Sequence, residues 1–108
     1  MNKHFSSLQS EQHLHPVILL VDDSPTVLLQ MRRMLEQAGF IVEEATNGED
    51  TLSLFSQLKP DLVLLDVMMP GMDGFETCAR LRQLPNGSRT PIIMLTSLDD
   101  HTSITRSY

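Results

Sequence analysis

Four short apolar segments, separated by stretches with helical periodicity, limit the fold of this chain more than any other feature. Three of them, Val17–Val21, Asp61–Leu65 and Pro91–Leu95, are aliphatic almost throughout. Continuous runs of this length are typical of strands that are buried on both faces of a parallel sheet. A weaker alternating pattern over Phe40–Ala45 predicts a further strand.

The segments between these strands carry the signals of helices. Ser24 is suited to cap a helix and Pro25 to its first turn. Apolar residues then recur at helical spacing as far as Ala38, before the stop signal Gly39. The other predicted helices lie between the turn Asn47-Gly48 and Lys59-Pro60, from Asp73-Gly74 towards Leu84, and from Asp99 or Asp100 into the end of the chain. Strands that alternate with helices form right-handed βαβ units, so the sequence predicts an α/β fold with a doubly wound parallel sheet of about four strands.

The composition excludes several classes of protein. The chain has 108 residues, which is room for one domain, and its hydrophobic content of 41% is enough for a core. Its net charge of −6 argues against direct binding to nucleic acid, which needs a basic face. No apolar run approaches the length of a membrane span, and the N-terminus lacks the hydrophobic segment of a signal peptide. A single cysteine, Cys78, cannot form an internal disulfide, so we expect a cytoplasmic protein without a nucleic-acid or membrane partner.

Residues 1–15 are polar and are predicted to be an N-terminal extension outside a domain at 16–108. The extension contains His4, His13 and His15, but these histidines do not have the spacing of a metal site. We interpret the segment as a solvated tail.

Polar residues follow three of the predicted strands. Asp22 and Asp23 come after the first strand, Asp66 after the third, and Thr96 and Ser97 after the fourth. In an open parallel sheet the functional crevice lies beyond the carboxyl ends of the strands. Carboxylates held together repel one another, and a hard cation with oxygen ligands relieves the repulsion. We therefore expect a Mg²⁺ site at which one carboxylate acts as a nucleophile towards a phosphoryl group.

Each of these residues alone has a simpler interpretation. Asp22 and Asp23 would be polar residues at which a strand leaves the core, Asp66 a loop aspartate, and Thr96 a turn hydroxyl. Their joint occurrence at three strand ends favours a site. Asp73 is different, because it stands at the start of a predicted helix and is expected to cap it.

Three sequence blocks resemble the signature blocks of response regulator receiver domains. They are Val21-Asp22-Asp23-Ser24, Leu65-Asp66-Val67-Met68-Met69-Pro70-Gly71-Met72-Asp73-Gly74 and Ile92-Ile93-Met94-Leu95-Thr96-Ser97. The resemblance covers Pro16 to about Arg106. It implies a flavodoxin-like sheet with strands in the order 2-1-3-4-5.

The resemblance also implies roles for individual residues. Asp66 matches the aspartate that accepts a phosphoryl group from a histidine kinase or a phosphotransfer protein. Asp22 and Asp23 match the acidic pair that holds magnesium, Asp23 directly and Asp22 mainly through water. Met68 matches the position whose backbone carbonyl binds the metal. Thr96 matches the hydroxyl that forms a hydrogen bond with the phosphoryl group and moves inward on activation. An output domain is implied in a longer parent protein.

The chain departs from this family at its C-terminal end. Receivers continue with a fifth strand and a fifth helix, and the active-site lysine and the switch aromatic of the family belong to that strand. Lys3 and Lys59 are the only lysines, and neither follows a strand predicted to end at the site. Tyr108 comes too early to be the aromatic. We interpret the sequence as a truncated piece of a longer regulator.

Two other functions stay open at this point. One is a receiver-like interaction module without phosphotransfer, which the missing lysine favours and the intact Asp22, Asp23, Asp66 and Thr96 oppose. The other is a phosphohydrolase with an aspartate nucleophile. Such enzymes usually carry a second aspartate two residues after the nucleophile, where this chain has Met68.

Without a fifth strand, Pro91–Leu95 is expected to be an unprotected apolar edge of the sheet, and such edges recruit other strands. We expect a second copy of the chain to cover it, giving a homodimer. The alternative is that Met1–His15 folds back over the edge. The dimer is preferred, because the extension has too few apolar residues to replace a strand and a helix.

Overall fold

The computed structural model describes residues 15–95 and 104–106, the latter as backbone. In chain order the elements are β1 (Val17–Val21), α2 (Pro25–Gln37), β2 (Ile41–Ala45), α3 (Gly48–Leu58), β3 (Leu62–Asp66), α4 (Gly74–Leu81), β4 (Ile92–Leu95) and β5 (Ile104–Arg106). The first four strands are parallel and lie in the order β2-β1-β3-β4. The predicted α/β fold with a flavodoxin-like, four-stranded parallel sheet is therefore confirmed.

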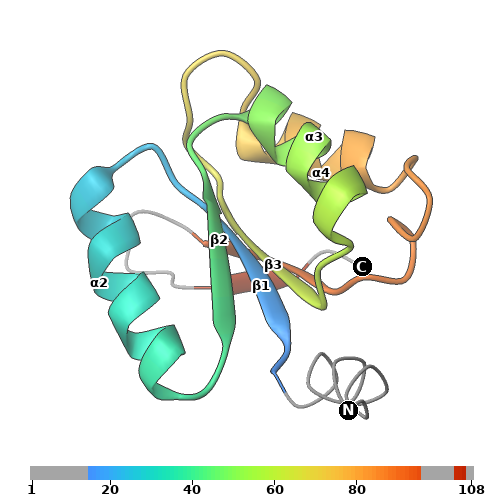
Figure 1. The fold of residues 1–108 in the computed structure, drawn as a ribbon. Coiled ribbons are helices and arrows are strands. Elements are labelled where there is room, and N and C mark those ends of the chain that lie inside the picture. The colour runs from blue at the N-terminus through green and yellow to red at the C-terminus, as the bar shows by residue number, and fades with distance from the viewer. Residues whose placement is uncertain (1–14, 96–103, 107–108) are drawn as a thin grey trace, which may run out of the picture.

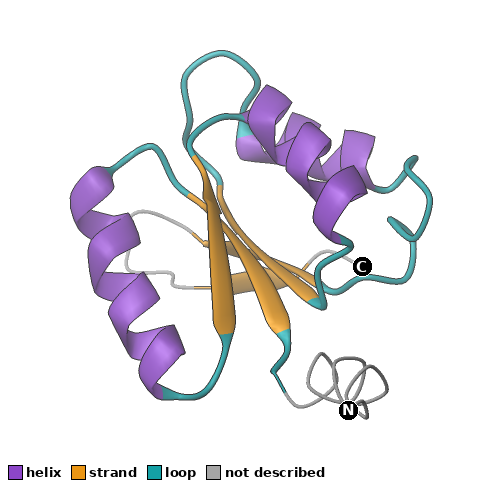
Figure 2. Ribbon diagram, in the orientation of Figure 1, coloured by secondary structure: helices purple, strands orange, loops and turns teal. Residues whose placement is uncertain are grey.

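The sheet is the middle of three layers (Figures 1 and 2). α2 lies on one face, and α3 and α4 lie on the other. Successive side chains of a strand point to opposite faces, so β1 contributes to both halves of the core. Leu19 and Val21 belong to the cluster that includes residues of α3 and α4, whereas Ile18 and Leu20 belong to the cluster on the α2 side. Burial on both faces explains why β1 is apolar throughout.

Two helices begin where the sequence predicts a cap. The hydroxyl oxygen of Ser24 accepts a hydrogen bond from the amide of Val27 at 3.4 Å, at the start of α2. The carboxylate of Asp73 accepts one from the amide of Glu76 at 2.9 Å, at the start of α4. These caps fix where the loops after β1 and β3 end.

Two expectations for the C-terminal part of the chain are wrong. Ile104–Arg106 forms β5 instead of continuing a fourth helix, and β5 pairs antiparallel with β4, with Met94 opposite Thr105. The edge of β4 is thus paired within the chain, not left open. Ile104 and Thr105 are β-branched and favour strands, and the polar backbone of an open edge offers them hydrogen-bond partners.

The predicted N-terminal extension lies, apart from His15, outside the described residues, and so does its proposed docking on the sheet edge. β1 begins at Val17, next to the expected domain boundary. Within the described part of the chain, no helix combines the length and the apolar character needed to cross a membrane.

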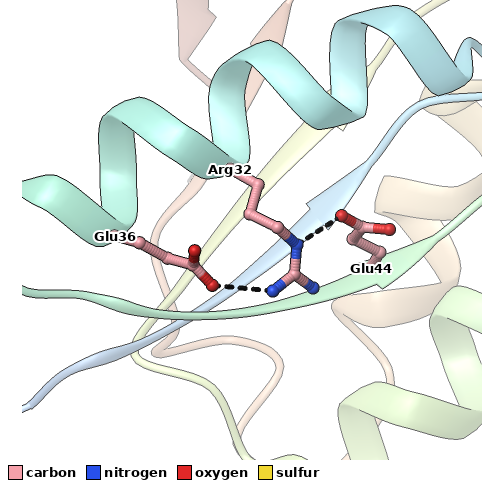
Figure 3. A network of polar contacts seen from close by, with 3 residues as sticks. All are labelled: Arg32, Glu36 and Glu44. Carbon is pink, nitrogen blue, oxygen red and sulfur yellow. Dashed lines mark hydrogen bonds and ion pairs between the residues drawn. The ribbon is translucent and has the colours of Figure 1, made fainter.

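A charged contact ties α2 to the edge strand β2 (Figure 3). Nε of Arg32 donates to Oε2 of Glu44 at 2.6 Å, and Nη1 of Arg32 donates to Oε2 of Glu36 at 2.7 Å. The bond to Glu44, and then the bond to Glu36, raise the pKa of Arg32 further above its usual value, so the guanidinium stays charged. The side chains of Arg32 and Glu44 are 33% and 32% exposed, so solvent screens their attraction.

Breaking this contact should weaken the fold slightly. We expect a double-mutant cycle of Arg32→Ala and Glu44→Ala, followed by urea unfolding, to give a coupling of about 0.5–1 kcal/mol that shrinks in high salt. A matched cycle of Arg33→Ala with Glu44→Ala should give a coupling near zero. Equal couplings in the two cycles would show that the contact does not form in solution.

Candidate functional site

Three aspartates meet at the carboxyl ends of β1 and β3. The two strands are paired in register, with Val21 opposite Leu65, so the residues that follow, Asp22 and Asp66, come side by side. One carboxylate oxygen from each of Asp22, Asp23 and Asp66 lies within 4.8 Å of the others. Asp22 and Asp66 are each 8% exposed, whereas Asp23 is exposed. The cluster offers oxygen donors, the type that a hard cation such as Mg²⁺ prefers, and they lie close enough together that they could hold a metal ion.

The two buried carboxylates are anchored by the loops that follow them. Oδ1 of Asp22 accepts a hydrogen bond from the amide of Ser24 at 2.9 Å. Oδ1 of Asp66 accepts one from the amide of Met68 at 3.2 Å. Each carboxylate is therefore oriented by an amide two residues ahead of it, in the manner of an Asx turn.

Burial sets the protonation of the cluster. Burial, together with the charges of Asp22 and Asp23, raises the pKa of Asp66 from 3.8 to about 6, although the amide of Met68 partly opposes the shift. Burial also raises the pKa of Asp22, as does the charge of Asp23. Three carboxylates at this spacing thus favour either a proton or a bound cation among them.

A hollow of about 530 Å³ opens beside the cluster. It is lined by Asp23, by residues 67–71 of the loop after β3, and by Asp73 and Phe75 at the start of α4. Met68, which lines the hollow, is 66% exposed. Of the three aspartates, Asp23 is the one that lines the hollow, so the cluster is open to solvent on the side of Asp23.

The remaining predicted site residue, Thr96, lies outside the described residues. The chain can be followed as far as Leu95, whose carbonyl accepts a hydrogen bond from the amide of Val67 at 3.0 Å. The end of β4 therefore lies directly against the loop after Asp66. Sequence reasoning missed Phe75, which is 59% exposed and lines the hollow. An aromatic residue directly after a predicted helix start, beside a predicted site loop, is the signal that could have identified it.

The chain matches the family model of the response regulator receiver domain over residues 18–108. It is 44% identical over 85 residues to protein PilH of Pseudomonas aeruginosa, and this match covers 79% of the chain and 70% of PilH. It is 41% identical over 85 residues to the transcriptional regulatory protein AfsQ1 of Streptomyces coelicolor, covering 79% of the chain and 36% of AfsQ1. The match thus spans about a third of that regulator's length.

A solved structure with a similar fold is the receiver domain of the sensor histidine kinase PA1611 of Pseudomonas aeruginosa. The TM-score is 0.74 at 32% sequence identity, and the match covers 76% of this chain and 67% of that one. That receiver domain is described with a magnesium ion coordinated in its active-site cleft.

Ionisation of Asp66 should work against folding of the metal-free protein. Its pKa is higher in the folded state, so the free energy of unfolding should fall as the pH rises from 3.8 to about 6. Asp66→Asn cannot ionise, and we expect it to be more stable at pH 7 by about 1–2 kcal/mol, less than the full shift would give because solvent screens part of the repulsion.

Urea unfolding between pH 4 and pH 8 in the presence of a chelator measures this effect. Asp50→Asn, which changes an exposed aspartate of α3, should keep the pH dependence of the wild type. An Asp66→Asn protein with that same dependence would contradict the raised pKa.

Proposed function

The chain belongs to the response regulator receiver domain family, and we propose that Asp66 is the residue on which it accepts a phosphoryl group from a histidine kinase or a phosphotransfer protein. A carboxylate oxygen of Asp66 attacks the phosphorus atom of a phosphohistidine. The P–N bond breaks as the P–O bond forms, and the leaving imidazole takes up a proton. The observation that carries the proposal is the position of Asp66, buried at the end of β3 with carboxylate oxygens of Asp22 and Asp23 within 4.8 Å, next to a hollow that Asp23 lines.

Asp22 and Asp23 are proposed to hold Mg²⁺ together with Asp66, with the backbone carbonyl of Met68 as a further ligand. Three carboxylate oxygens within 4.8 Å of one another support this assignment. Magnesium suits such a site because it takes a few carboxylates and completes its shell with water and a phosphate oxygen. Bound there, it would neutralise charge on the phosphoryl oxygens. The magnesium ion described for the PA1611 receiver domain supports the same choice of metal.

Thr96 is proposed to supply the hydroxyl that forms a hydrogen bond with the phosphoryl group and moves on activation. It follows Leu95, whose carbonyl oxygen accepts a hydrogen bond from the amide of Val67. A phosphoryl group on Asp66 would add charge and acceptor oxygens close to the end of β4. The end of β4 is thus the nearest part of the sheet that can respond to phosphorylation of Asp66.

We propose a signalling switch and not a hydrolase. Hydrolases of this chemistry usually carry a general acid, an aspartate, two residues after the nucleophile. Here that position is Met68, a thioether that cannot transfer a proton and whose side chain is 66% exposed. The intact acidic cluster in turn opposes an interaction module without phosphotransfer.

The cellular setting is proposed from the family. We propose that the chain acts in the cytoplasm and that an output domain in a longer parent protein reads its state, as the partial match to AfsQ1 suggests. The argument for a homodimer depended on an open β4 edge, and β5 covers that edge. The described part of the chain therefore gives no reason to prefer a dimer.

Labelling with a radioactive acyl phosphate in the presence of Mg²⁺ tests the acceptor. We expect the wild type and Asp50→Asn to be labelled equally, since Asp50 is exposed on α3. Asp66→Asn should show only background label, because it lacks the nucleophilic carboxylate. Undiminished labelling of Asp66→Asn would move the acceptor to another residue.

Titration with Mg²⁺, followed by calorimetry or NMR, tests the metal ligands. Asp23→Ala should weaken binding by about tenfold or more, because the loss of a direct ligand costs at least as much as the loss of an outer-shell partner. Asp50→Ala removes the same charge elsewhere on the surface and should leave the affinity near that of the wild type. If both variants bind Mg²⁺ alike, Asp23 is not a ligand.

A further inference from the structure

The first turn of α4 rests directly on the backbone of Asp66. A methyl group on Gly74 would overlap the carbonyl oxygen of Asp66 and lie 2.7 Å from Cα of Val67. The amide of Gly74 donates to the carbonyl oxygen of Val67 at 2.9 Å. Only a glycine permits so close an approach, so the start of α4 fixes the position of the acceptor backbone.

The same region of α4 is held on its other side by the start of α3. A methyl group on Gly48 would lie 2.6 Å from Oγ1 of Thr77 and 2.7 Å from Sδ of Met72. Thr77 is fully buried, and its hydroxyl donates to the carbonyl oxygen of Asp73 at 2.8 Å. Met72 is 8% exposed and belongs to the loop that leads from Asp66 to α4. The start of α4 therefore lies between β3 and α3 without room for a methyl group on either side.

These contacts give Gly48 an influence on the acceptor loop. Thr77 is β-branched, buried and hydrogen-bonded, so it resists displacement. Met72 can move its sulfur, but its Cβ would lie 2.9 Å from the added methyl group, so its backbone would have to shift as well. Displacement of Met72 moves the loop that carries Met68, and displacement of Thr77 moves the first turn of α4, which follows that loop.

We infer that Gly48, although it lies outside the acidic cluster, is a positioning residue for the phosphoryl-acceptor site. Its lack of a side chain lets Met72 and Thr77 pack against α3 and so holds the loop after Asp66 in place relative to Asp22 and Asp23. The inference rests on the proposed function for its consequence, which is metal affinity. The packing itself does not depend on that function.

The test compares Gly48→Ala with Ser53→Ala, a change of similar size at an exposed position of α3. In metal-free protein, Gly48→Ala should shift the NMR amide signals of Val67 and Met68, and Ser53→Ala should leave them unchanged. In a Mg²⁺ titration, Gly48→Ala should bind about tenfold more weakly, the lower end of what the loss of an outer-shell partner causes. Alanine is the better helix former, so a weaker site could not be ascribed to a weaker helix.

Unchanged amide signals and an unchanged Mg²⁺ affinity in Gly48→Ala would overturn the inference, even if that variant were less stable to urea. If the wild type itself neither binds Mg²⁺ nor accepts label, the proposed function fails, and the metal-free amide signals still decide whether Gly48 positions the loop. Should Gly48→Ala not fold, Met72→Ala removes the same contact without adding volume. It should shift the same two amides, and a Met72→Ala spectrum unchanged at Val67 and Met68 would equally refute the inference.

Discussion

The site depends on two carboxyl groups that the sheet forces together. Asp22 and Asp66 follow directly on strands paired in register, and both strands are buried on both faces. A slip of one residue would exchange every side chain between the two halves of the core, so burial fixes the register far more firmly than carboxylate repulsion can oppose it. The raised pKa of Asp66 is the consequence of that constraint.

The enforced proximity of these carboxylates fits the proposed role of the cluster in a phosphorylation switch. A proton, a cation and a phosphoryl group with its cation would each relieve the repulsion in a different way. The loop after Asp66 is the part of the site that lies against both α4, through Gly74, and the end of β4, through Val67. The backbone next to Asp66 is therefore in contact with two other elements of the fold.

Much of this arrangement could be predicted from the sequence because it is locally encoded. Val17–Val21 is apolar throughout, which predicts a strand with both faces buried. Ser24 and Asp73 are residue types that favour the N-cap position, so they predict where their helices begin. β5 was missed, because three residues carry little signal and their pairing depends on a distant open edge. The close approach of Gly48 to Thr77 could not be predicted from the sequence either, because it arises only when α3 and α4 pack on the same face of the sheet (Figure 1).

The dipeptide Asp22-Asp23 shows how neighbouring, identical residues can be given different roles by their backbone. Asp22 is buried, and its Oδ1 is engaged by the amide of Ser24. Ser24 in turn uses its own hydroxyl oxygen to cap α2, so the orientation of Asp22 is tied to the start of that helix. Asp23 is exposed and lines the hollow. A fixed inner carboxylate and an accessible outer one agree with the roles that the resemblance implies, in which Asp23 would contact the metal directly and Asp22 would act mainly through water.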